Sequence, residues 1–133
     1  RSAQGVAISV LVTAGISNAR CAGDRADWRT FQTDADPTGT INIIILTNAM
    51  MSHAAMVESV MLATEAKTVA MRKLGVKSPV SGAIATGTGT DAIAVANGFG
   101  SETIRFCGKH VLFGEMLASV VIEAITESLS DRV

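Results

Sequence analysis

The stretch of this sequence whose residue types and spacing best suit catalysis or ligand binding is a short turn of glycine, threonine and aspartate. Residues 85–96 read ATGTGTDAIAVA. Glycine lets a ligand approach the backbone closely, threonine adds a hydroxyl group, and Asp91 adds a carboxylate. The same residue types are common in hairpin connections. The turn is therefore either a ligand-binding loop or a plain hairpin turn.

Polar residues at predicted strand ends and in turns form the wider set of candidate site residues. A histidine and an aspartate near threonine hydroxyls and glycine N–H groups could activate water and hold an oxyanion during acyl transfer. His110, Asp91 and Lys109 are accordingly the candidate catalytic residues. The candidate substrate-binding residues are Asn18, Asp24, Asn42, Asn48, Glu65, Lys67, Thr86, Gly87, Thr88, Gly89 and Thr90.

His110 is predicted to point inward from the first turn of a helix near the carboxyl end of the chain. It shares a helical stripe with Gly114, Leu117 and Val121, whereas Glu115 belongs to the solvent-facing stripe. The missing side chain of Gly114 would leave room beside the imidazole. A lone histidine on an apolar face is usually a core group, and the alternative here is a group that transfers protons.

The sequence lacks the motifs of several common metal-binding, phosphate-binding and catalytic sites. It holds two histidines and no CxxC or HExxH spacing, so no dedicated metal site is expected. It also lacks the phosphate-binding pattern GxxxxGK[ST] and the nucleophile pattern GxSxG. Cys21 and Cys107 remain alternative nucleophiles, although no activating base stands beside either of them in the sequence.

Composition indicates one globular domain over residues 1–133. Hydrophobic residues make up 48% of the chain and charged residues 17%, which is typical of a packed core. A net charge of −1 without a basic cluster argues against a nucleic-acid partner. No apolar run is long enough to span a membrane, and no signal peptide is visible. Two cysteines without a secretory signal suggest reduced thiols and a cytoplasmic protein.

The pattern of apolar residues predicts a mixed sheet covered by two long helices, an α/β protein of the α+β type. About five strands are expected, and with the helices their order is β-β-α-β-β-β-α. The two N-terminal strands are apolar on both faces and are predicted to be buried. The strands are predicted at 5–13, 40–47, 80–86, 91–96 and 103–107. The helices are predicted at 53–74 and 109–129. Ser52 is the predicted N-cap of the first helix, and Gly75 follows its carboxyl end.

The segment 14–39 lacks clear periodicity and is long for a loop in a compact domain. It carries five charged residues before residue 30, two further aspartates at 34 and 36, and Trp28, the single tryptophan of the chain. It is either a surface excursion or a lid that orders over a ligand.

Five motifs in order resemble those of the adenosylcobinamide amidohydrolases, which serve corrinoid salvage. They are TAGISNARCAGD (13–24), GTINIIILTN (39–48), ATEAKTVAMRKLGV (63–76), ATGTGTDAIAVA (85–96) and CGKHVLFGE (107–115). The resemblance implies a cytoplasmic enzyme that hydrolyses the amide between aminopropanol and a corrin-ring propionate, giving adenosylcobyric acid. The corrinoid would be the substrate and bring its own cobalt, with no further cofactor.

The family also has a substantial N-terminal part that this chain lacks, so the partner could be that segment or a second copy of the chain. Two alternatives to the enzyme remain. One is a non-catalytic corrinoid-binding module, and the other is a purely structural subunit.

Overall fold

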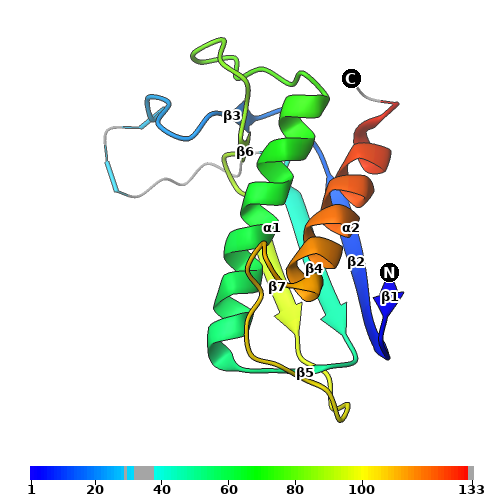
Figure 1. Cartoon of the computed structure of the whole chain (residues 1–133). Helices are drawn as coiled ribbons and strands as arrows, with labels where there is room; N and C mark the ends of the chain where they lie inside the picture. Colours follow the sequence, from blue (N-terminus) through cyan, green and yellow to red (C-terminus); the bar gives the residue numbers. More distant parts are fainter. Residues whose placement is uncertain (29, 32–37, 132–133) are drawn as a thin grey trace.

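The computed structural model describes residues 1–28, 30–31 and 38–131, and in this part of the chain two helices lie side by side on one face of a four-stranded sheet (Figure 1). The prediction of an α+β fold with a mixed sheet and two covering helices is confirmed. In chain order the elements are β1 (Ser2–Ala3), β2 (Val6–Ala14), β3 (Ala19–Arg20), β4 (Ile41–Thr47), β5 (Met50–Met51), α1 (His53–Lys73), β6 (Gly87–Thr88), β7 (Ala92–Ala96), β8 (Thr103–Ile104) and α2 (Leu112–Leu129).

The main sheet has the strand order β1-β2-β4-β7. β2 and β4 are antiparallel, whereas β4 and β7 are parallel and are joined by a crossover that contains α1. Parallel pairing places the starts of β4 and β7 at the same edge of the sheet, where β2 ends. Residues 15–20, 38–40 and 87–91 therefore meet at this edge.

One face of the sheet packs against the helices, and the other face is exposed. In β4, Ile43 and Ile45 are buried, while Ile44 and Leu46 on the alternate face are 42% and 37% exposed. Successive side chains of a strand point to opposite faces, and both helices cover the same face. The prediction that these strands are buried on both faces is therefore wrong for the described part of the chain.

The first helix begins and ends where the sequence predicts. The Ser52 hydroxyl caps its amino end by accepting the Ala55 N–H at 3.1 Å. At its carboxyl end Gly75 adopts φ +68°, a left-handed conformation that glycine enters at little cost. None of the described helices is long and apolar enough to cross a bilayer.

Three predicted elements differ from the structure. Residues 80–86 do not form the predicted strand. The chain turns through Gly82, which adopts φ +72°, the Ser78 N–H closes the turn on the Ala83 carbonyl at 2.8 Å, and Ile84 makes an isolated bridge to Lys77. The predicted strand at 103–107 is only the two-residue β8, which pairs with β5. The second helix begins at Leu112 and not at residue 109.

Within the long segment 14–39, the described residues 21–28 project from the body of the protein near β3 and β6 (Figure 1). β3 at its start pairs with β6, so the turn at 87–90 is held by this segment and is not a hairpin between neighbouring strands. Arg29, Asp34 and Asp36, which the lid interpretation includes, lie outside the described residues.

Candidate functional site

Asp91 lies beneath the glycine–threonine turn, and donors surround its carboxylate. Oδ1 accepts hydrogen bonds from the Ile41 N–H at 3.0 Å and from the Thr88 hydroxyl at 2.5 Å. Oδ2 accepts the Thr88 N–H at 3.0 Å and is ion-paired with Lys67 Nζ. Two carboxylate oxygens offer about four lone-pair sites, so the donors of the protein itself occupy the whole carboxylate.

The Lys67–Asp91 ion pair is buried, with side chains 10% and 9% exposed. A Cβ at Gly87 would overlap Asp91 Oδ2 and lie 2.7 Å from Lys67 Nζ. Glycine is therefore required at this position because the ion pair fills the space beside it. Asp91, a candidate catalytic residue from the sequence, therefore has a carboxylate that faces internal donors and not open solvent.

A cavity of about 160 Å³ lies in front of the same turn. Pockets that enclose a whole drug-sized ligand are roughly 300–1,000 Å³, so this cavity suits a side arm of a larger molecule. The structure brings three of the predicted binding residues together here. The described residues that line the cavity are Asn18, Arg20, Asp27, Trp28, Gly89 and Thr90.

Asn18 contributes a buried amide whose oxygen lacks a partner. Within the described part of the chain, Oδ1 is inaccessible to solvent and accepts no hydrogen bond. A Cβ at Gly39 would lie 3.2 Å from Oδ1, and a Cβ at Gly89 would lie 3.6 Å from Nδ2. The backbone at two glycines thus packs closely against this amide. Buried polar atoms usually have a partner, so this acceptor is a candidate ligand contact.

The N–H groups of the turn point into the protein and not into the cavity. Thr88 donates to Asp91 at 3.0 Å, Gly89 donates to the Asn18 carbonyl at 3.3 Å, and Thr90 N lies 3.5 Å from the Thr88 hydroxyl. The sequence suggested that these groups would serve a ligand. They do not, because acceptors within the turn and the Asn18 carbonyl already satisfy these donors.

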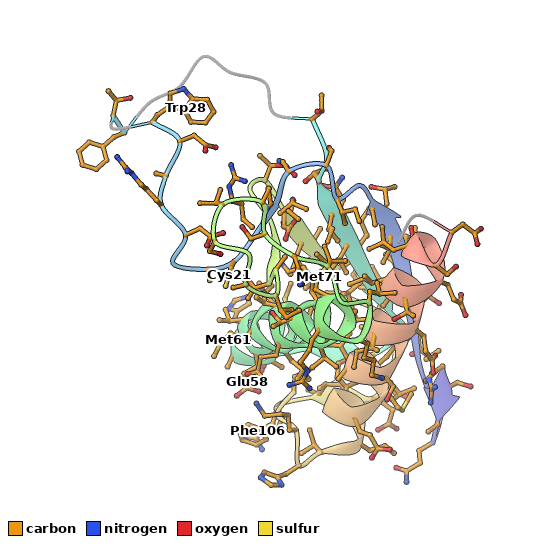
Figure 2. The ribbon with its side chains drawn as sticks, turned by 90° about the horizontal axis from the view of Figure 1, so that it is seen from above. Cys21, Trp28, Glu58, Met61, Met71 and Phe106 are labelled. Carbon is orange, nitrogen blue, oxygen red and sulfur yellow. The ribbon has the colours of Figure 1, made fainter. Side chains whose placement is uncertain are left out.

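Three lining residues, Arg20 at the end of β3 and Asp27 and Trp28 in the segment after it, were not among the predicted site residues. Arg20 donates through Nη2 to Asp27 Oδ2 at 2.6 Å. Trp28 is 46% exposed and lies on the projecting segment (Figure 2). The only sequence signal was the concentration of charge, with the one tryptophan, in a segment too long for a simple loop.

A second groove, of about 190 Å³, runs between α1 and the segment at 107–109. Lys109 pairs with Glu65 at 2.5 Å there, and the Glu58 carboxylate accepts the Cys107 N–H at 2.6 Å. Figure 2 shows Glu58 and Met61 on the side of α1 near Phe106. Burial raises the pKa of the Cys107 thiol, which argues against a nucleophilic role.

His110 is exposed and lies in a turn before α2, so the prediction that it points inward is wrong. The helix begins only at Leu112, which removes His110 from the helical stripe. Gly114 leaves no space beside the imidazole either. A Cβ there would overlap the Gly108 carbonyl oxygen and lie 2.8 Å from that of Cys107.

The other predicted binding residues are spread over the molecule. Asn42 donates to the Thr13 hydroxyl at 3.0 Å on the exposed sheet face. Asn48 accepts the Ala7 N–H at 2.7 Å at the opposite edge of the sheet. Thr86 accepts the Ala22 N–H at 2.9 Å and so ties the projecting segment to the turn.

Asp24 also fixes the projecting segment. It accepts the Ser78 hydroxyl at 2.5 Å and the Cys21 N–H at 2.8 Å. The hydrogen bond from Ser78, followed by those from Ser81 and Cys21, holds the pKa of Asp24 below its ordinary value of 3.8.

A pKa lowered in the folded state makes the stabilisation by Asp24 depend on pH. The ionised carboxylate stabilises the fold above the ordinary pKa, and this contribution is lost as the pH falls through the folded-state pKa. Chemical unfolding of the wild type and Asp24→Asn should therefore differ most near pH 6 and progressively less from about pH 4 downward. Asp131→Asn is the control. A wild-type advantage over Asp24→Asn that stays constant across this range would contradict the expectation.

Comparisons with known proteins identify the family. The family model described as adenosylcobinamide amidohydrolase matches residues 1–133. Proteins named adenosylcobinamide amidohydrolase from Methanosarcina mazei and Halobacterium salinarum are each 32% identical over 94% of this chain, and the matches cover 58% and 51% of their own lengths. An uncharacterised protein of Methanocaldococcus jannaschii is 44% identical over 68% of this chain and 36% of its own length.

The chain thus spans about half the length of the two named relatives. No solved structure matches it. The family model covers the whole chain, and it includes the turn, the asparagine and the segment that form the cavity. The chain belongs to the adenosylcobinamide amidohydrolase family.

Proposed function

We propose that this protein hydrolyses the aminopropanol amide of adenosylcobinamide, giving adenosylcobyric acid and 1-amino-2-propanol in corrinoid salvage. The observation that carries the proposal is the cavity at the turn, where an arginine, a carboxylate and an unpaired amide oxygen meet. Its volume of about 160 Å³ fits the aminopropanol arm, while the corrin ring stays outside.

The charged pair in the cavity can perform both halves of amide hydrolysis. Asp27 is the one carboxylate among the described lining residues, and in this proposal it accepts a proton from the attacking water. Arg20 places a fixed positive charge where the oxyanion of the tetrahedral intermediate develops. The protonated Asp27 then returns the proton to the leaving nitrogen as the C–N bond breaks. Asp91 and Lys67 position the turn and take no proton.

Incubation of the protein with adenosylcobinamide, without added nucleotide or metal, tests the reaction. Chromatography should show adenosylcobyric acid and 1-amino-2-propanol accumulating in equal amounts. Binding without product would favour the corrinoid-binding module. No binding of corrinoid at all would favour the structural subunit.

The two candidate proton-transfer residues can be compared directly. Asp27→Asn should lower turnover about a hundredfold, within the usual range for loss of a general base. His110→Gln should keep turnover within about threefold of the wild type, because the described lining of the cavity does not include His110. His53→Gln, at another exposed histidine, is the matched control. The reverse pattern would return the catalytic role to His110, as the sequence alone suggested.

A further inference from the structure

We propose that Asn18 recognises the amide that is cut, with Oδ1 accepting its N–H and so distinguishing the amide substrate from the carboxylate product. This assignment rests on the proposed function and adds a specificity-determining residue to it. Its basis is the one buried side-chain acceptor in the described part of the chain that has no partner.

The position of Asn18 is fixed while its side-chain oxygen stays unused. Its main-chain carbonyl accepts the Gly89 N–H at 3.3 Å, which anchors the residue to the turn. Asn18 lines the cavity together with Gly89, which packs beside the amide with no side chain between them. A buried acceptor without a partner loses the hydrogen bonds it would make in water. A ligand that brings an N–H restores one of them.

The charges around the cavity favour a neutral ligand over an anion. Arg20 is paired with Asp27, so the described lining has no net charge. A carboxylate placed against Asn18 Oδ1 would set two acceptors against each other and leave both without a donor. The secondary amide of the substrate offers an N–H at the same position. After hydrolysis that N–H leaves with aminopropanol, so binding of the product weakens.

Cobinamide and cobyric acid form a matched pair of ligands for testing this assignment. They share the corrin ring and its primary amides and differ only where the secondary amide of one is a carboxylate in the other. Trp28 is the single tryptophan and lines the cavity, so quenching of its fluorescence by the corrin reports binding. Stopped-flow titration reads affinity before hydrolysis proceeds.

Wild-type protein should bind cobinamide about tenfold more tightly than cobyric acid, the effect expected for one buried acceptor that gains or lacks its donor. Asn18→Ala should reduce this ratio of affinities to about one or two, mainly by weakening the binding of cobinamide. Asn18→Asp keeps an acceptor oxygen in place and should keep the preference for the amide. Asn97→Ala removes an asparagine that hydrogen-bonds Met51 outside the cavity and is the matched control. Circular dichroism melting checks that each variant is folded.

Several outcomes would overturn the assignment. These are an unchanged ratio in Asn18→Ala, an equal loss of affinity for both ligands, loss of the preference in Asn18→Asp as well, or no saturable binding of either ligand. An equal loss would mean that Asn18 holds a peripheral amide common to both. The hydrolysis assay is scored separately. If cobinamide is bound with the Asn18-dependent preference but is not cut, only the proposed reaction fails, and if it is cut without that preference, only this assignment fails.

Discussion

Replacing Asp91 by alanine is expected to lower the free energy of unfolding by about 3–5 kcal/mol, because it leaves Lys67 charged, buried and unpaired. It also removes the acceptor of the Ile41 and Thr88 N–H groups. Urea unfolding followed by circular dichroism measures the loss. A cost below about 1 kcal/mol would mean that the pair behaves like a surface ion pair.

Two further variants separate the buried charge from the lost hydrogen bonds. Lys67→Met combined with Asp91→Ala removes both charges, and we expect the double variant to be more stable than Asp91→Ala alone. Glu65→Ala breaks the exposed pair with Lys109 on the same helix and should cost less than about 1 kcal/mol. A double variant as unstable as Asp91→Ala would show that the hydrogen bonds, and not the unpaired charge, dominate the loss.

Replacing Gly114 by alanine should destabilise the protein by about 3 kcal/mol, although alanine is the better helix former. The new Cβ would overlap the Gly108 carbonyl oxygen and crowd that of Cys107. Both obstacles are backbone atoms, so the segment at 107–109 and α2 must move apart. The same substitution in a free helix would stabilise it by about 1 kcal/mol, so the sign of the change is decisive.

Thermal and urea unfolding of Gly114→Ala measure whether the substitution lowers or raises the stability of the protein. Ser119→Ala, a more exposed position of α2, is the control and should change stability by no more than about 0.5 kcal/mol. If Gly114→Ala were more stable than the wild type, the backbone at 107–108 could move away from α2 at little energetic cost.

Elements whose signals are local could be predicted from the sequence alone. The apolar, β-branched runs of β2 and β4 predicted strands, and the serine before α1 and the glycine after it predicted where that helix begins and ends. Caps and side-chain periodicity depend on residues within a few positions of each other. The α+β class followed from the order of these elements.

Local patterns failed where a turn interrupted a periodic stretch or where a distant segment supplied the pairing partner. Residues 80–86 have an apolar pattern compatible with a strand, yet they turn, and the glycine–threonine turn pairs with β3 instead of closing a hairpin. His110 fits a helical stripe only if the helix starts at 109, and the turn before α2 breaks that periodicity. Residue spacing predicts a shared helical face only for residues that are part of the helix in the folded protein.

The arrangement of the site depends on contacts between segments that are far apart in the sequence. The sequence selected Asp91, Lys67, Gly89 and Asn18 as separate polar or turn residues, but it gave no reason to pair Lys67 with Asp91 or to set Asn18 against Gly89. These pairs are 24 and 71 positions apart. Lys67 reaches Asp91 because α1 packs beside β6 and β7, and Asn18 meets Gly89 because β3 pairs with β6. Which lone pairs remain for a ligand depends on these long-range contacts, because donors from other segments fill the acceptors of Asp91 and leave the oxygen of Asn18 free.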